Sequence, residues 1–209
     1  VATLRAAIEN GITLVDTAAS YGAGRSETVV GMGLKGIRRK VVLATKCGAA
    51  FNPAKNALDM DLTPKGIRRE IEASLRRLNT DWIDVYQFHY PDPGTPLADS
   101  LGEMTRLKEE GKIRAIGLSN FDRPLLDEAR KHAQIDSMQV KCSLLDREND
   151  DLIAYCKEIG VGVITYGSIA GGMLSGVYKT PPVFEPGDRR KFFYPFFDEP
   201  LFSRCRRLV

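Results

Sequence analysis

The sequence predicts an α/β protein, a (β/α)8 TIM barrel of which about six of the eight strand–helix units are present. Three features support this fold. Six short apolar runs recur along the chain, and each is followed by a segment with helical spacing. The runs are rich in Val, Ile and Leu with little alternation, which is typical of parallel strands covered on both faces. Polar residues follow the end of every run.

The predicted strands are residues 12–15, 41–45, 83–88, 115–118, 138–140 and 162–165. Between them, Thr63 and Pro64 begin a helix as its N-cap and first-turn proline. The apolar residues that follow have helical spacing: Ile67, Ile71, Leu75 and Leu78. Two more helices are predicted over residues 97–110 and 149–158. The stretch 180–202, rich in Pro and aromatic residues, is predicted to be a long connection.

The polar residues at the strand ends decide between a barrel and an open doubly wound sheet. In a barrel, the carboxyl ends of the strands converge on one mouth. In an open sheet, six strands would spread the same residues along an edge too wide for one site. The barrel is therefore predicted, as a single domain over residues 1–209. The strand-end residues are Asp16, Tyr21, Lys46, His89, Ser119, Asn120, Gln139 and Tyr166.

Composition argues against several classes of function. A net charge of +3 leaves no basic surface for nucleic acid or a membrane. The apolar stretches are too short to span a bilayer, and the first residues do not read as a signal peptide. The four cysteines form no C-x-x-C pair, so we expect free thiols, a cytoplasmic protein and no metal site.

One glycine pattern is misleading. Gly31, Gly33 and Gly36 match the G-x-G-x-x-G pattern of dinucleotide-binding loops. That fingerprint must follow a strand and open a helix. Here the pattern ends a helical segment and precedes a strand, which predicts a helix end and a turn in place of a phosphate site.

Six segments, in order along the chain, resemble the aldo-keto reductase family. They are residues 11–22 with Asp16 and Tyr21, 41–46 with Lys46, 84–89 with His89, 116–121 with Ser119 and Asn120, the surroundings of Gln139, and 164–172 with Tyr166. The resemblance implies catalytic roles for Asp16, Tyr21, Lys46 and His89. It implies cofactor contacts from Ser119, Asn120, Gln139, Tyr166, Gly167, Ser168, Ile169 and Gly171. It also implies NADP, with NAD as the alternative, and a small carbonyl compound or alcohol as substrate.

The chemistry of these residue types agrees with the resemblance. Carbonyl reduction needs a hydride on carbon and a proton on the developing alkoxide. Tyr21 would donate that proton, and Lys46, held by Asp16, is expected to lower the tyrosine pKa from its usual ~10. His89 would orient the substrate oxygen. Tyr166 would stack on the nicotinamide while Ser119, Asn120 and Gln139 hold its carboxamide, and the backbone of residues 167–174 would approach the pyrophosphate.

Each of these residues also has a structural interpretation. Asp16 could cap a turn, Lys46 could be a surface charge, and Ser119–Asn120 could be an N-cap pair for the next helix. Gln139 could be an interior amide and His89 a hydrogen-bonded structural histidine. Their joint placement at one rim favours a site.

The chain departs from the family pattern in three places. Family members carry a first strand before the equivalent of Val1 and an eighth after Val209, so a chain truncated at both ends is expected, without the segment that holds the adenosine of the cofactor in the family. Cys142 replaces a common aromatic, and the aromatic stretch 188–202 is expected to cover core more than to bind substrate. The alternative function is therefore a non-catalytic, cofactor-sensing barrel that binds a partner. Substrate and oligomeric state stay open.

Overall fold

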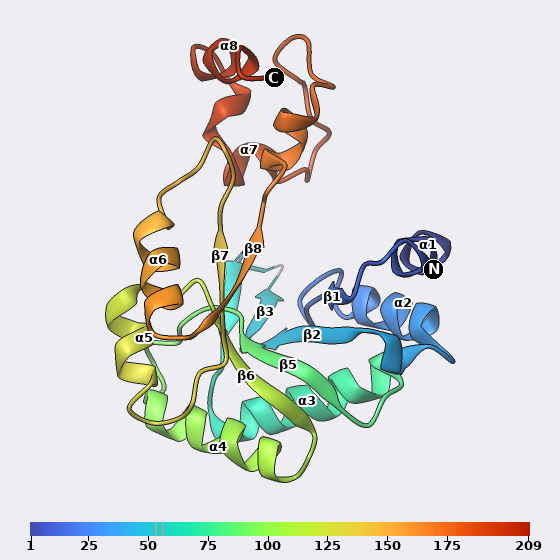
Figure 1. Cartoon of the computed structure of the whole chain (residues 1–209), viewed down its shortest axis with the longest axis vertical. Helices are drawn as coiled ribbons and strands as arrows, with labels where there is room; N and C mark the ends of the chain where they lie inside the picture. The colour runs from blue at the N-terminus through green and yellow to red at the C-terminus, as the bar shows by residue number, and fades with distance from the viewer. Residues whose placement is uncertain (53, 56) are drawn as a thin grey trace.

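The computed structural model describes residues 1–52, 54–55 and 57–209. Its centre is a parallel sheet of six strands in the order β1-β2-β5-β6-β7-β8. The sheet curls into part of a barrel, with helices along its convex side (Figure 1), which confirms the predicted fold class. The strands are β1 (Leu14–Asp16), β2 (Val42–Cys47), β5 (Ile83–Phe88), β6 (Ile113–Ser119), β7 (Ser137–Lys141) and β8 (Gly162–Tyr166).

The predicted strand boundaries are correct to within two residues. At the first strand, predicted over residues 12–15, pairing begins at Leu14 opposite Val42 and runs to Asp16. Because β1 is an edge strand with one neighbour, its extent is set by where β2 lies beside it, which the apolar pattern does not report. Strand β5 lies at residues 83–88, as predicted.

In the described part of the chain, six helices precede the last strand of the sheet. They are α1 (Ala2–Glu9), α2 (Arg25–Leu34), α3 (Pro64–Leu78), α4 (Leu97–Glu109), α5 (Arg123–Ala129) and α6 (Asp150–Glu158), with a short 3-10 turn η1 (Arg38–Lys40). Thr63 caps α3 as predicted, since its hydroxyl accepts a hydrogen bond from the Gly66 amide. Across the described ranges, no helix combines the length and apolar character needed to cross a membrane.

The misleading glycine pattern belongs to helix packing. Residues 25–34 form α2, so Gly31 and Gly33 are helical and Gly36 follows the helix end in a left-handed conformation. A Cβ on Gly31 would lie 2.7 Å from the carbonyl oxygen of Arg77, at the end of α3. The glycine therefore lets two helices approach closely, and the pattern begins inside a helix, not in the turn between a strand and a helix that a dinucleotide loop requires.

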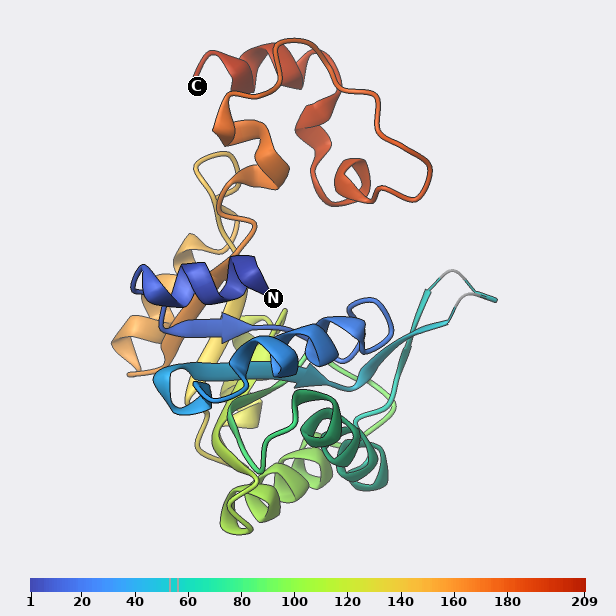
Figure 2. The ribbon, with the colours of Figure 1, turned by 90° about the vertical axis from the view of Figure 1, so that its right-hand side faces the viewer.

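A β-hairpin that the sequence analysis did not predict follows β2. Strands β3 (Ala49–Asn52) and β4 (Ala57–Met60) pair antiparallel and project from the body of the molecule (Figure 2). Its turn signals, Asn52-Pro53 and the Gly48 that precedes the first strand, are present in the sequence. The hairpin leaves the sheet at the same end as the predicted site residues.

Residues 167–209 form a second, smaller unit, which we call the C-terminal lobe. It contains η2 (Ala170–Ser175), α7 (Arg190–Phe193), η3 (Pro195–Phe197) and α8 (Leu201–Arg206). It has its own apolar cluster of Ala170, Met173, Phe196, Phe197 and Phe202. The stretch 180–202 is thus more than the predicted connection, because it contributes the buried Phe196, Phe197 and Phe202 to this cluster.

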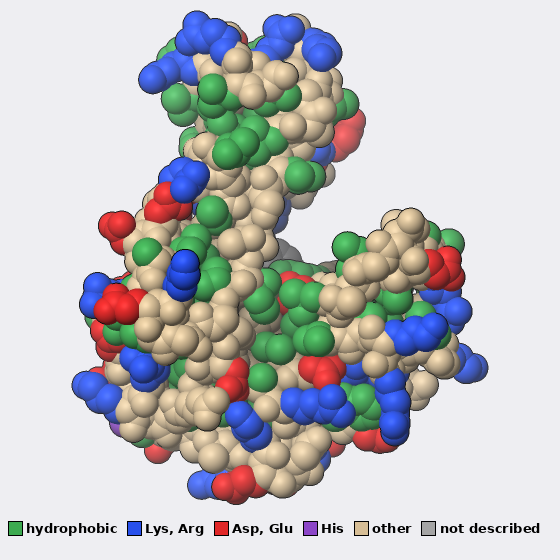
Figure 3. Space-filling view, in the orientation of Figure 1, with side chains coloured by type: hydrophobic (Ala, Val, Ile, Leu, Met, Phe, Trp, Pro, Cys, Tyr) green, Lys and Arg blue, Asp and Glu red, His purple; other side chains and the backbone are tan. Residues whose placement is uncertain are grey.

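The lobe stands above the carboxyl ends of β7 and β8 (Figure 1). A hollow separates it from the part of the molecule that carries α1, and hydrophobic side chains line the middle of that hollow (Figure 3). The main core lies instead between the sheet and its helices.

Candidate active site

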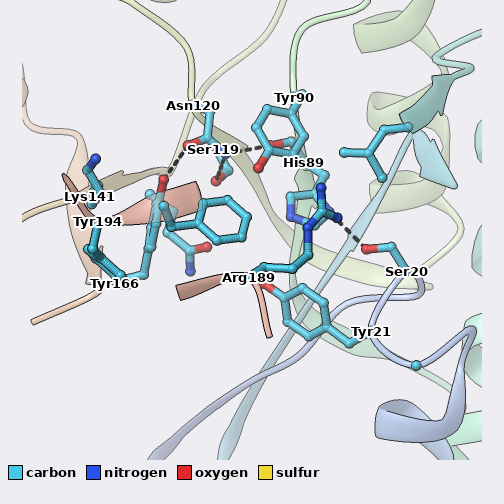
Figure 4. Close-up of a pocket in the computed structure, with 14 residues that line it drawn as sticks. Ser20, Tyr21, His89, Tyr90, Ser119, Asn120, Lys141, Tyr166, Arg189 and Tyr194 are labelled. Carbon is cyan, nitrogen blue, oxygen red and sulfur yellow. Dashed lines mark hydrogen bonds between the residues drawn. The ribbon is translucent and has the colours of Figure 1, made fainter. Parts of the chain in front are cut away.

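The carboxyl ends of the strands surround one cavity of about 430 Å³. Six of the predicted site residues line it, brought together from four strands and the loop after β1 (Figure 4). The C-terminal lobe closes one side with Arg189, Phe193 and Tyr194. The lining residues predicted from the sequence are Tyr21, His89, Ser119, Asn120, Gln139 and Tyr166.

Asp16 and Lys46 lie behind Tyr21, next to the cavity wall. The Lys46 side chain is 1% exposed, and its Nζ donates to Asp16 Oδ2 at 2.6 Å and to the Thr17 carbonyl at 2.9 Å. A third, longer hydrogen bond of 3.5 Å joins Nζ to the hydroxyl of Tyr21. The three polar groups therefore form one chain, from carboxylate to ammonium to phenol.

Gln87 completes this chain, and the sequence analysis missed it. Its Nε2 donates to the second oxygen of Asp16 at 3.2 Å, and the residue is fully buried on β5. Gly117 lies beside Gln87 in the strand register, and any Cβ there would be 2.6 Å from Gln87 Cγ. The missing side chain of Gly117 thus makes the space that Gln87 occupies.

His89 is fixed from several directions. Its backbone amide donates to the Cys47 carbonyl at 3.0 Å, which continues the pairing of β5 with β2. The ring stacks on Tyr90 with centroids 4.8 Å apart and meets the edge of Tyr21 at 5.7 Å. Its Nδ1 lies 3.3 Å from the hydroxyl of Ser20 (Figure 4).

The surroundings of these groups determine their protonation. Burial, together with the smaller effect of the nearby Lys46 charge, lowers the pKa of His89 from 6.5 to about 4, so the imidazole is neutral at pH 7. Burial also lowers the pKa of Lys46, while Asp16 opposes that effect through charge and a hydrogen bond.

The predicted lowering of the Tyr21 pKa is wrong for this structure. Although the residue is 43% exposed, burial raises the pKa of its hydroxyl, and the Asp16 carboxylate raises it again. Lys46 forms its close ion pair with Asp16, at 2.6 Å, while its Nζ lies 3.5 Å from the Tyr21 hydroxyl. The phenol therefore keeps its proton at neutral pH, as a proton donor must.

The opposite wall of the cavity is a hydrogen-bonded group centred on Asn120. The Tyr166 hydroxyl donates to Asn120 Oδ1 at 2.8 Å, and Asn120 Nδ2 donates to the His89 carbonyl at 2.9 Å and to Ser119 Oγ at 3.1 Å. Asn120 has a φ of 60°, a left-handed conformation that asparagine tolerates better than most residues. The N-cap interpretation of Ser119–Asn120 is wrong, because Asp122 caps α5.

Gln139 differs from its neighbours in the wall. It is 3% exposed and lines the cavity, yet its side-chain amide has no hydrogen bond to any other described residue. The amide faces the cavity, where a ligand or water can complete its hydrogen bonds. Gln139 is therefore prepared to bind a polar group that enters the cavity.

The predicted phosphate-binding segment lies outside this cavity. Gly167 and Gly171 pack against Tyr194, whose atoms would be 2.8 Å from a Cβ at either position. Ile169 is 65% exposed, and the hydroxyl of Ser168 is 3.4 Å from that of Thr165. Packing explains the two glycines here, and a cofactor role for the segment stays a prediction.

The match to a family model decides the classification. The model of the Aldo/keto reductase family matches residues 1–204. The chain belongs to this family. It is 39% identical over 193 residues to the NADH-specific methylglyoxal reductase of Escherichia coli, a match that covers 86% of the chain and 59% of that protein.

Two solved structures of this family are similar in fold. The glycerol dehydrogenase of Gluconobacter oxydans superposes with a TM-score of 0.88 and 36% identity, over 97% of this chain and 64% of that one. The aldo/keto reductase of Klebsiella pneumoniae, in complex with NADP and acetate, superposes with a TM-score of 0.73 and 34% identity. That match covers 82% of this chain and 58% of the Klebsiella chain. The chain thus spans about three fifths of the length of these relatives.

Several lining residues were not predicted. Ser20 and Tyr90 are direct sequence neighbours of the predicted Tyr21 and His89, and Lys141 follows a predicted strand, so their positions in the sequence contained a usable signal. The aromatic stretch 188–202 is divided between two roles, since Phe196, Phe197 and Phe202 are buried while Phe193 and Tyr194 line the cavity. The expectation that the stretch mainly covers core therefore holds for only part of it.

Proposed function

We propose that this chain carries the catalytic centre of an NAD(P)H-dependent oxidoreductase that interconverts a small aldehyde or ketone and its alcohol. The observation that supports this best is the chain of hydrogen bonds from Asp16 through Lys46 to Tyr21, beside the neutral imidazole of His89. These groups can hold a carbonyl oxygen and protonate it. Family membership supports the same reaction class.

In the proposed reduction, each of the four catalytic residues has a separate role. A carbonyl oxygen enters between Tyr21 and His89, where the imidazole N–H donates a hydrogen bond and polarises the C=O bond. Tyr21 gives its proton to the oxygen as negative charge develops there. Lys46 then stabilises the phenolate through the 3.5 Å contact, and Asp16 keeps the ammonium in place. In the oxidation direction, the phenolate accepts the proton.

The cavity wall suits a nicotinamide group. The unpartnered amide of Gln139 and the hydroxyl of Ser119 can bind a carboxamide, and Tyr166 offers an aromatic ring. Asn120 Oδ1 can accept one more hydrogen bond beside that of Tyr166, whereas Nδ2 can donate to a ligand only by exchanging a present bond. When bound, the nicotinamide supplies the hydride. Gly167, Ser168, Ile169 and Gly171 stay in the proposal as backbone contacts for the phosphates.

The relatives suggest the substrate class. One is named for methylglyoxal and NADH, another for glycerol, and a third was solved with NADP. We infer a small polar carbonyl compound or polyol, a sugar included, and NADP as the cofactor with NAD as the alternative. The four unpaired cysteines support a reducing, cytoplasmic location.

The test replaces the proposed proton donor. Tyr21→Phe should reduce turnover of methylglyoxal with NADPH or NADH by about 10²- to 10⁴-fold, while thermal stabilisation by the cofactor persists. Tyr155→Phe is the matched control, because that hydroxyl binds Asp127 on the outer helices and its loss should leave turnover intact. Full activity in Tyr21→Phe would refute the mechanism. Stabilisation of the wild-type protein without turnover would favour the cofactor-sensing alternative.

A further inference from the structure

The two ring nitrogens of His89 have different surroundings. Nδ1 lies 3.3 Å from Ser20 Oγ, and the ring itself lines the cavity. Because burial lowers the pKa of His89 to about 4, the neutral ring carries one proton at pH 7, on one nitrogen or the other. Only a protonated Nε2 can donate to a substrate oxygen while Nδ1 faces Ser20. The position of this single proton therefore decides whether His89 can donate a hydrogen bond to the substrate oxygen.

The ring cannot easily turn over to exchange its nitrogens. Tyr90 stacks on one face at 4.8 Å and the edge of Tyr21 meets it at 5.7 Å. The backbone of His89 is held on both sides, by the Cys47 carbonyl and by the Asn120 amide. Nδ1 therefore stays directed toward the loop that carries Ser20.

That loop is itself firmly positioned. The Tyr21 amide donates to the Ala18 carbonyl at 3.1 Å, and the Ser26 amide donates to the Tyr21 carbonyl at 3.2 Å. The same turn thus brings both Ser20 and Tyr21 against the ring of His89. Nδ1 is the one hydrogen-bond partner of the Ser20 hydroxyl among the residues that the structure describes.

We propose that Ser20 is a positioning residue that sets the tautomer of His89. Its hydroxyl donates to Nδ1, which must then be unprotonated, and the ring proton lies on Nε2, the nitrogen available to the substrate. The reverse arrangement would leave Nε2 as an acceptor, and an acceptor repels a carbonyl oxygen. The lowered pKa of His89 agrees with this role, since a doubly protonated ring could not accept from Ser20. The proposal rests on the function proposed above.

The tautomer can be measured without any catalysis. The chain has two histidines, so ¹⁵N-labelling of histidine and long-range ¹H–¹⁵N correlation at pH 7 resolves both rings. We expect His89 to show a protonated Nε2 and an Nδ1 that accepts a hydrogen bond. In Ser20→Ala the Nδ1 resonance should move toward that of a free acceptor or a protonated Nδ1 should appear, and Ser20→Thr should restore the wild-type pattern. His132, which is 3.1 Å from Glu128, serves as the internal control and should not change.

Two results would overturn the proposal: a proton on Nδ1 of His89 in the wild-type protein, or an unchanged His89 pattern in Ser20→Ala. The wild-type spectrum decides the first even if the variant does not fold.

Steady-state kinetics of the Ser20 variant provide a second test of the proposal. Ser20→Ala should lower kcat/KM for the carbonyl compound by about 2- to 10-fold, the usual value of one neutral hydrogen bond, with cofactor affinity unchanged. Equal kcat/KM in the two proteins would count against the proposal. Absent turnover in the wild-type protein would refute the proposed function and leave the spectroscopic result to decide the role of Ser20.

Discussion

Gly117 should be among the least replaceable residues of the sheet. It pairs with Gln87 on one side and Ser137 on the other, and these three residues form one layer across β5, β6 and β7. A Cβ at this position would lie 2.6 Å from both Gln87 Cγ and Ser137 Oγ, and 3.3 Å from Val85 Cγ1. Ordinary contacts between such atoms need about 3.5 Å, so two neighbours must each move by roughly 1 Å.

Gly117→Ala should therefore lower the free energy of unfolding by about 1–3 kcal/mol, the usual cost of overpacking a filled interior. Urea denaturation followed by circular dichroism measures this, with the m-value checked for two-state behaviour. Gly102→Ala is the matched control: this glycine lies within α4, nothing occupies the 4 Å around its added Cβ, and the change should stabilise by about 0.5–1 kcal/mol. If the two variants were equally stable, the packing argument would fail.

Two further predictions concern buried charge. Below pH 6.5 the unfolded chain takes up a proton that folded His89, with its pKa of about 4, does not, so the free energy of unfolding should decrease by up to about 3 kcal/mol as pH falls from 6.5 to 4. Urea titrations should show less of this decrease in His89→Gln, and identical pH profiles would contradict the expected burial. Arg77→Met leaves the fully buried Glu27 carboxylate without its 2.6 Å partner and should destabilise by about 3 kcal/mol. Arg147→Met removes the exposed ion pair with Asp150 and should lower the free energy of unfolding by less than about 1 kcal/mol. Equal losses of stability in the two arginine variants, measured by urea denaturation, would contradict this prediction.

Much of the fold and the site was predictable because parallel strands bring their carboxyl ends together. Once the apolar runs are taken as strands, Lys46, His89 and Gln139 must meet near one mouth, whatever the details of packing. Gln87 was also within reach. It lies on β5, two residues before His89, where the pairing with β2 continues, and residues two apart in an extended chain point to the same face.

Other parts depend on contacts that have no sequence period. Arg189 and Tyr194 reach the cavity only because the C-terminal lobe packs its own apolar cluster and stands over the strand ends. The pKa of Tyr21 also depended on packing. Burial raises it most and the Asp16 carboxylate raises it again, and neither effect follows from the spacing of residues along the chain.

Asn120 connects parts of the mouth that the sheet itself does not join. Its amide reaches the end of β5 through the His89 carbonyl and the end of β8 through the Tyr166 hydroxyl, although β6 and β7 lie between those strands. The spacing of two opposite walls is therefore governed by the length of one side chain as well as by the curvature of the backbone. A single substitution at Asn120 can therefore widen or narrow the mouth of the cavity. Evolution could change the size of the substrate that enters in this way while the strands stay the same.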